Sequence, residues 1–396
     1  MLTKIRVKNY KSLRDVSIGL GQRNVLVGAN MSGKSNVIDL LRFIHDITFS
    51  RQPGSSALTS AVFSRGGFDE ILWKGGNAEV ILIGLSGWDV WDGVEWFWDY
   101  ELTVQGGFPG GNFRITSEEL HSRRGENGVV QPLTKTKEFQ RYFLGIDGRD
   151  LGPTSDPSRS ILEFEIPGWQ GSLLRSTIAK WRFYELVPAV MRSPNPTAAS
   201  LFLDKHGENL SQWLLYLQSR YGESFAQIQT VLRDTLPQVK GLFTSPTQQS
   251  TVLLGSHEKH LLRPVMLSDM SAGELAFIAF LSLIFSPPEL VGTLYCVEDL
   301  ENYLHPRLMQ TLLEVLRQSQ DEWEKKREAA QIVMTTHSPF VVDKTKLDEI
   351  VFVENKHGAT SCSRPSDKPH LRKLLQDEEI GLGDLVYSGA LNDVGE

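Results

Sequence analysis

Cysteine is nearly absent from the sequence, because only Cys296 and Cys362 occur among its 396 residues. Two cysteines exclude a disulfide framework and a zinc site with four cysteine ligands. The opening residues, Met1–Leu13, lack the apolar stretch of a secretory signal peptide. We therefore expect the protein to reside in a reducing cytoplasm.

The sequence also lacks a long hydrophobic run and an excess of one charge sign. The longest apolar stretch, Leu275–Phe285, has about half of the roughly 20 residues that a membrane-spanning helix needs, so we expect a buried helix and no membrane span. The 41 Lys and Arg against 48 Asp and Glu give a net charge of −7. This balance provides no whole-protein attraction to nucleic acid, although it is compatible with a local basic groove. With 40% hydrophobic residues and no dominant residue type, the composition excludes a disordered, collagen-like or coiled-coil chain and predicts a soluble globular protein.

The length predicts two or three domains of about 100 to 200 residues each, or one large domain with insertions. The first 60 residues read as strand, turn, strand and helix. Asn24–Val27 is a short apolar strand that runs into Gly28, and a helix is expected to begin near Gly33. Apolar residues at helical spacing follow: Val37, Ile38, Leu40, Leu41 and Ile44.

Residues 61–185 have the alternating pattern of antiparallel strands, with Asp92-Gly93 as a hairpin turn. Four tryptophans flank this turn: Trp88, Trp91, Trp96 and Trp98. Cross-strand packing is favoured over a base-stacking surface for nucleic acid, because no Arg or Lys is interleaved among them. Residues 105–160 are rich in Gly, Ser and Pro and predict loops with one hairpin.

Helical periodicity returns over residues 200–240 and ends at Pro237, which predicts a small helical insertion. A polar link over 244–260 is followed by a second α/β stretch. We expect helices over 275–285 and 306–328, and strands over 293–297, 331–335 and 350–353. The predicted parts are a first lobe over 1–190, a helical insertion and linker over 191–262, and a second lobe over 263–396.

The residues from Gly28 to Ser35 read Gly-Ala-Asn-Met-Ser-Gly-Lys-Ser and match the phosphate-loop pattern GxxxxGK[ST], between a strand and a helix. Backbone N–H groups of such a loop and the positive end of the helix dipole surround the β-phosphate. Lys34 is expected to neutralise β- and γ-phosphate oxygens, and the Ser35 hydroxyl to ligate Mg²⁺. This pattern predicts a protein that binds a nucleotide with Mg²⁺.

Three further stretches carry chemistry. Glu298-Asp299 follows the buried strand, where acids can hold the Mg²⁺ shell and polarise the attacking water. Ser271 to Glu274 has the S-x-x-E form of a helix capping box. His337 follows an apolar strand in the run Thr-Thr-His-Ser-Pro.

In this order, the motifs resemble the ATP-binding-cassette (ABC) type ATPase head. More narrowly, the whole chain is similar to the RecF/SMC-related proteins and to the AAA15/AAA21-type ATPases of bacterial defence loci, including the ATPase part of the OLD nucleases. The run Glu298–Pro306 resembles the D-E-P-E-N-x-L-H-P of that group, and Lys8–Leu13 resembles its opening strand. The resemblance implies an α/β ABC-ATPase head: a P-loop mixed sheet, an antiparallel β region and a small helical insertion.

The resemblance also implies residue roles. Glu298 takes the place of the Walker B aspartate, as a metal ligand with Ser35, and Asp299 that of the catalytic glutamate. His337 is the switch histidine that senses the γ-phosphate, and Ser271, Gly273 and Glu274 form the signature that reaches the nucleotide of a second subunit. The remaining residues of the cofactor-binding set are Gly28, Asn30, Ser32, Gly33, Lys34 and Asn36.

Two departures from the family pattern matter. The acid pair is swapped in type, and Asp299 is one methylene shorter than Glu, so we expect slow hydrolysis of ATP. We find no Q-loop glutamine, and Phe63–Phe68 lies where that lobe junction falls without an evident role.

The resemblance implies a head-to-tail dimer on ATP, with a higher oligomer left open. About 55 residues follow the His337 motif, too few for a Toprim nuclease domain, and Leu382–Leu391 resembles the ending of stand-alone ATPases of the group. The function predicted is therefore a sensor or regulatory ATPase of an antiphage complex, with a separate nuclease or toxin effector. The alternative is a RecF-like repair clamp that binds DNA; a transporter ATPase fits less well.

Overall fold

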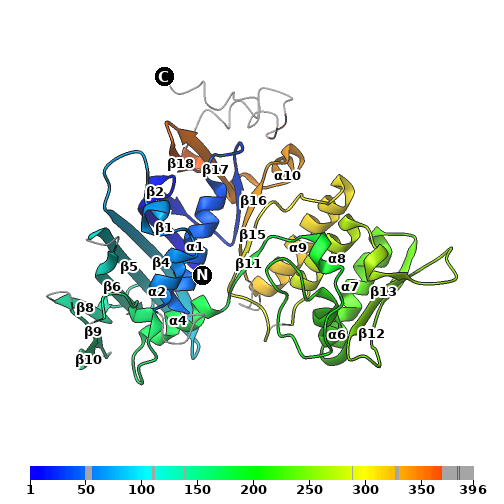
Figure 1. The fold of residues 1–396 in the computed structure, drawn as a ribbon, viewed down its shortest axis with the longest axis horizontal. Helices are drawn as coiled ribbons and strands as arrows, with labels where there is room; N and C mark the ends of the chain where they lie inside the picture. The colour runs from blue at the N-terminus through cyan, green and yellow to red at the C-terminus, as the bar shows by residue number, and fades with distance from the viewer. Residues whose placement is uncertain are drawn as a thin grey trace. The chain divides into compact units, whose positions relative to one another are not determined.

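The computed structural model describes residues 1–49, 56–108, 112–137, 140–145, 147–154, 156–287, 289–325, 330–367, 381 and 383. The chain divides into two compact units (Figure 1). The first unit comprises Met1–Trp181, Gln331–Val333 and Lys346–Glu396, and the second comprises Arg182–Ala330 and Met334–Thr345. The division into parts over 1–190, 191–262 and 263–396 stays a prediction.

The first unit contains a six-stranded antiparallel sheet in the order β2-β1-β4-β5-β6-β7. Asp92 and Gly93, at φ 49° and 73°, form the turn between β4 and β5. Both angles are left-handed, as a two-residue hairpin loop that matches the strand twist requires, so the predicted turn is confirmed. Across this hairpin Trp88 pairs with Phe97, and Trp98 is buried. The strands are β1 (Leu2–Tyr10), β2 (Leu13–Gly19), β4 (Val80–Trp91), β5 (Val94–Phe108), β6 (Asn112–Arg124) and β7 (Gln131–Pro132).

Residues 105–160 contain more sheet than the sequence predicts. Besides β6, they form a three-stranded sheet in the order β10-β9-β8, from β8 (Thr134–Lys137), β9 (Gln140–Leu144) and β10 (Asp150–Thr154). The expectation of loops with one hairpin was wrong because polar residues fill buried positions of these strands, which hides their alternation.

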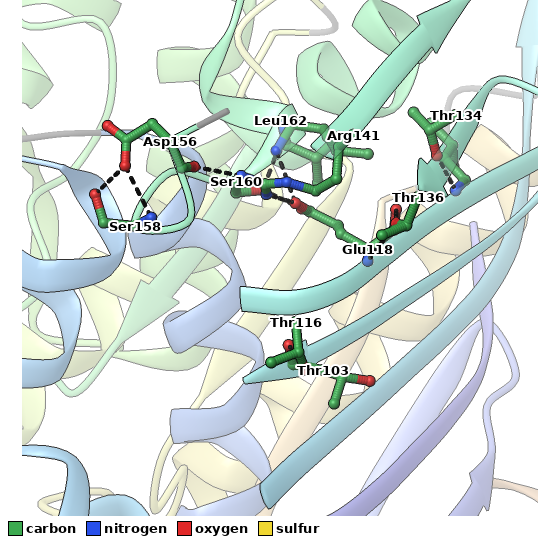
Figure 2. A network of polar contacts seen from close by, with 12 residues as sticks. Thr103, Thr116, Glu118, Thr134, Thr136, Arg141, Asp156, Ser158, Ser160 and Leu162 are labelled. Atoms are coloured by element: carbon green, nitrogen blue, oxygen red, sulfur yellow. Dashed lines mark hydrogen bonds and ion pairs between the residues drawn. The ribbon is translucent and has the colours of Figure 1, made fainter. Parts of the chain in front are cut away.

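The buried polar residues of these strands include an ion pair (Figure 2). Glu118 and Arg141 are 0% and 1% exposed and are paired with each other. The Glu118 carboxylate also accepts hydrogen bonds from the Tyr100 hydroxyl at 2.7 Å, the Ile161 amide at 2.9 Å and the Ser160 hydroxyl. These donors offset the cost of burying the carboxylate.

The phosphate loop of the first unit lies between a parallel strand pair and a helix. Strand β3 (Arg23–Val27) pairs in parallel with β17 (Ile350–Lys356), which continues antiparallel into β18 (Ala359–Ser363). Helix α1 (Lys34–Thr48) packs against α2 (Ala57–Phe63) and α4 (Gly171–Ala179). All the apolar residues at the predicted spacing in α1 are buried, so this helix is confirmed. The shorter elements are α3 (Phe68–Ile71), η2 (Ile161–Glu163), η4 (Leu347–Glu349) and η5 (Pro365–Asp367).

In the second unit, helix α8 (Ala272–Ile284) is the most apolar element. Every residue from Leu275 to Ile284 is buried, against α5 (Pro188–Met191), α7 (Gly222–Thr235) and α9 (Pro306–Lys325). The buried helix that the apolar run predicts is therefore confirmed. Between Trp181 and Asp343 the chain also forms β11 (Trp181–Tyr184), β15 (Leu294–Val297), β16 (Gln331–Thr336), η3 (Leu267–Asp269) and α10 (Pro339–Asp343), of which Trp181 and Gln331–Val333 belong to the first unit.

The helical insertion of the second unit carries its own sheet, in the order β12-β13-β14. Residues 252–258, predicted as part of a polar link, form a strand instead. The sequence pattern misses it because Ser256 occupies a buried position where the pattern calls for an apolar residue. Helices α6 and α7 pack on β12. The elements are α6 (Leu210–Arg220), β12 (Val239–Pro246), β13 (Val252–Glu258) and β14 (Val265–Met266). Among the described residues, no helix is both long and apolar enough to cross a membrane.

Candidate functional site

The loop from Gly28 to Gly33 encloses the side chain of Lys34. Lys34 is 4% exposed, and its Nζ donates to the carbonyls of Gly28 at 2.7 Å and Ala29 at 2.9 Å. Both acceptors belong to the loop itself, so the ammonium lies inside the turn. This places a fixed positive charge where the pattern predicts phosphate oxygens.

Two positions of the loop require glycine. A Cβ at Gly28 would lie 2.0 Å from the carbonyl oxygen of Val353, and one at Gly33 would lie 2.1 Å from Thr360 Oγ1. Gly33 also has φ 107°, a left-handed angle that favours glycine. The glycines of the pattern therefore allow β17 and β18 to approach the loop.

The start of α1 fits a polyphosphate. Gly33 is the N-cap, no side chain of the described part of the chain caps the helix, and its first turn has no acid. Amides of an uncapped helix start, with the positive end of the dipole, bind anions. Within the described ranges, the Ser32 hydroxyl is buried without a hydrogen-bond partner, whereas Ser35 and Asn30 are exposed. Of the predicted residues, Asn36 donates a hydrogen bond from its side-chain amide to the Ser12 hydroxyl at 2.6 Å.

In the second unit, the acids and the histidine converge from two strand ends. The Asp299 carboxylate lies 3.6 Å from His337 Nε2. Thr335 fixes the aspartate twice, because its hydroxyl accepts from the Asp299 amide at 2.8 Å and donates to Oδ1 at 3.1 Å. The Glu298 amide donates to the carbonyl of Tyr184 at 2.9 Å and so continues the β11–β15 pairing. Two predicted residues 38 positions apart, Asp299 and His337, are thus brought together.

A third acid, Glu301, holds the histidine loop. Its carboxylate accepts from the Thr336 hydroxyl at 2.9 Å and from the His337 amide. The sequence predicts no role for Glu301, although this residue belongs to the run Glu298–Pro306. Its position two residues after the acid pair is the sequence signal for this contact.

The signature residues lie at the N-terminus of α8. Ser271 is the N-cap, and its hydroxyl accepts from the Glu274 amide at 3.2 Å, which confirms the predicted helix start. Burial raises the pKa of the Glu274 carboxyl, and Glu258 raises it further, against a lowering by the Ser271 main chain. A cavity of about 290 Å³ adjoins these residues, and Tyr303, His305 and Leu308 also line it.

Gly273 fits tightly against the loop that follows the acids. A Cβ at this position would lie 2.7 Å from the main-chain oxygen of Tyr303. Tyr303 has φ 70° and is 53% exposed, and Asp299 has φ 48°. Left-handed angles at such residues are uncommon and mark constrained positions. One loop thus reaches from Asp299, the predicted catalytic acid, to Gly273, the predicted signature glycine.

Arg65, in the stretch Phe63–Phe68, forms ion pairs with two acids of α1. Its Nε lies 3.0 Å from Asp39 and its Nη2 lies 3.0 Å from Asp46. Its guanidinium also faces the Phe43 ring at 5.3 Å. In the described structure this stretch fastens α2 to α1.

A glycine loop that encloses a lysine and leads into an uncapped helix defines a P-loop nucleotide-binding protein. The sequence model of the AAA_21 family, described as "AAA domain, putative AbiEii toxin, Type IV TA system", matches residues 23–343. The chain therefore belongs to this family. A comparison with curated proteins gave no match.

Solved structures agree on the fold. The "SmcHead bound to the C-winged helix domain of ScpA" has a TM-score of 0.53 at 13% identity, over 93% of this chain and 99% of that one. An Smc head domain with an extended coiled coil, bound to the C-terminal domain of ScpA, from Pyrococcus furiosus, has a TM-score of 0.53 at 12% identity, over 95% and 99%. The fold is thus the ABC-type ATPase head of the RecF/SMC-related group that the motifs predict, and the chain is an ATPase of this type.

Proposed function

We propose that the protein binds ATP with Mg²⁺ at the phosphate loop and hydrolyses it. The observation that carries this proposal is the enclosure of the Lys34 ammonium by loop carbonyls at the uncapped start of α1. Lys34 and the loop amides hold the β- and γ-phosphates. Ser35 and Glu298 hold the Mg²⁺, which would neutralise charge on the phosphate oxygens when bound.

The chain's own acid and histidine then act on the attacking water. Asp299 orients the water by accepting its hydrogen bond, and Thr335 restricts the carboxylate to one orientation. His337, 3.6 Å from Asp299, senses the γ-phosphate. Fixed groups of this kind lower the barrier because they need little reorganisation in the transition state.

Hydrolysis of ATP by the purified chain tests the proposal. We expect turnover that depends on Mg²⁺ and is lost in Lys34→Ala. Lys74→Ala, which removes an exposed lysine paired with Glu70, is the control and should keep full activity. Equal turnover in Lys34→Ala and the wild type would refute the assignment.

We further propose that ATP joins two copies head to tail. Ser271 and Gly273 of one copy then reach the γ-phosphate held by Lys34 of the other. Sedimentation in the presence and absence of ATP, with a hydrolysis-deficient Asp299→Asn chain, should show a dimer only with ATP. A monomer under both conditions would contradict this step.

The partner we propose is a separate nuclease or toxin effector of an antiphage complex. The description of the family names a putative toxin system, and the related Smc heads are bound to a ScpA domain, which supports a protein partner. A pull-down from the native host with ATP, with Lys34→Ala as control, should recover the effector. Strongly salt-dependent DNA binding in its place would instead favour the RecF-like clamp.

A further inference from the structure

The strongest unexplained feature of the first unit is the contact between the β17–β18 hairpin and the phosphate loop. The hairpin touches the loop at three points. Val353 O lies against Gly28, and the side-chain amide of Asn355 donates to the Met31 carbonyl at 3.2 Å. The Thr360 hydroxyl donates to the Ser32 carbonyl at 2.9 Å. All of these hairpin residues lie beyond residue 343, where the family match ends.

The Thr360 hydroxyl is the centre of a directed chain of hydrogen bonds. Its single proton goes to Ser32 O, so in the contact of 2.6 Å with Ser12 Oγ the serine must be the donor. Ser12 in turn accepts from the Asn36 amide at 2.6 Å. These hydrogen bonds therefore connect α1, the β1–β2 turn, β18 and the phosphate loop in that order.

The link between Thr360 and the phosphate loop is buried. Thr360 is 3% exposed, and its amide also donates to the Ser12 carbonyl at 2.8 Å. The loop that it holds contains left-handed angles at Met31 and Gly33, of 64° and 107°. A loop with such angles costs conformational free energy to order, and a ligand that had to order it would bind more weakly.

We propose that the β17–β18 hairpin is a clamp that presets the phosphate loop for nucleotide, and that Thr360 is its positioning residue. Thr360 contacts the loop at Ser32 and Gly33, so we expect it to act through these two residues. This inference rests on the proposed function only for the identity of the ligand, Mg·ATP.

Thr360→Val tests the clamp, because valine keeps the shape and cannot donate. The variant should bind Mg·ATP about five- to tenfold more weakly in calorimetry, as the loss of one buried hydrogen bond predicts. Amides of residues 28–35 should exchange with deuterium faster in the variant, without nucleotide. Thr360→Ser, which keeps the hydroxyl, should retain wild-type affinity and exchange. In Thr360→Val, kcat at saturating ATP should stay within about twofold of the wild type.

The control is Thr345→Val, because Thr345 is also a buried threonine whose hydroxyl donates to a main-chain carbonyl, Val341 O at 2.7 Å. It should leave ATP affinity and exchange of residues 28–35 unchanged. If Thr360→Val does not fold, Ser12→Ala removes the preceding link and should give a smaller change in the same direction. Wild-type affinity and exchange in a folded Thr360→Val or Ser12→Ala would overturn the clamp. Failure of the wild type to bind Mg·ATP would refute the proposed function, while the exchange measurement would still decide the clamp.

Discussion

Asp299 combines a strained backbone with a carboxylate fixed by Thr335. The role predicted for Asp299 is that of the catalytic glutamate, and its side chain is one methylene shorter than glutamate. Asp299→Asn should lower kcat by about 10² or more, as loss of a positioned base does, while Mg·ATP binding persists. Asp299→Glu should raise kcat, because the longer carboxylate holds the water better. Steady-state phosphate release measures kcat of both variants. An Asp299→Glu chain slower than the wild type would contradict the idea that the shorter side chain of Asp299 limits hydrolysis.

Asp39 provides a prediction that depends on pH. Burial raises its pKa, but Arg65 and Lys11 outweigh burial, and the pKa is lowered from 3.8. Because the folded pKa lies below the unfolded one, the stabilisation is fully present above the unfolded pKa and is lost as pH falls through the folded pKa. Asp39→Asn should therefore cost about 2 kcal/mol at neutral pH, the scale of hydrogen bonds to charged groups, and progressively less below pH 3.8.

Urea unfolding at neutral and acidic pH measures this difference. The control is Asp15→Asn, which removes a carboxylate that is 68% exposed and paired with Lys8, and a surface pair of this kind contributes about 0–1 kcal/mol. A cost of Asp39→Asn that does not change with pH would show that the carboxylate's charge is not what stabilises the fold.

The residues of the site differ in how far the sequence reveals them. Lys34 is found by motif, because the phosphate-loop pattern has a chemical reason for its spacing, whereas the roles of Asp299 and His337 come from the resemblance of the ordered motifs. Thr360 is not found, because its acceptor, Ser32, is 328 positions away and no local pattern records that contact. The positions of Thr335 and Glu301 are readable in the quoted runs, but their partners become evident only from the fold.

At the scale of elements, Gly273 links α8 to the loop after β15. Gly273→Ala would place a Cβ 2.7 Å from Tyr303 O, a main-chain atom that cannot swing away. We expect a loss of about 1–3 kcal/mol in the free energy of unfolding from this overpacking, together with reduced ATP turnover. Gly222→Ala is the matched control, since Gly222 begins α7 and nothing lies within 4 Å of its Cβ position. Equal stability of the two variants would contradict the close fit.

The antiparallel region depends on Glu118. Glu118→Gln keeps the shape but leaves the buried Arg141 without a charged partner (Figure 2). Breaking a buried pair costs about 3–5 kcal/mol, so chemical denaturation should show a loss of that order. Glu101→Gln, in the same sheet, removes an exposed pair with Arg6 and should cost about 0–1 kcal/mol. Similar losses in the two variants would show that burial of the pair is unimportant.

Strand and helix predictions succeeded where the apolar pattern was complete, as in the periodic α1 and the continuous apolar run of α8. They failed for β6, β8–β10, β12 and β13, because Glu118, Arg141, Thr244 and Ser256 are buried polar residues. Only tertiary partners make such burial favourable, and a local pattern does not contain them. The stretch Leu382–Leu391 lies outside the described residues except for Gly383, so its resemblance stays a prediction.

At the scale of the whole molecule, the composite site makes a prediction that a self-sufficient chain does not. Ser271→Arg blocks the signature with a bulky charge, and Lys34→Ala disables the phosphate loop. Each variant alone should lack ATP hydrolysis, because every site in its dimer contains the defect. In a mixture, the heterodimer contains one site built from the intact Lys34 of one chain and the intact Ser271 of the other.

An equal mixture of Ser271→Arg and Lys34→Ala should therefore recover up to about a quarter of wild-type turnover, since half of the dimers are mixed and each has one intact site. Ser271→Ala is the control for the lost helix cap, which costs about 1 kcal/mol, and it should not mimic the block by Arg. Phosphate release measured over a range of mixing ratios should peak near equal amounts. Activity of Ser271→Arg alone, or no recovery in any mixture, would mean that each chain completes its own site, and the head-to-tail dimer would then have to be abandoned.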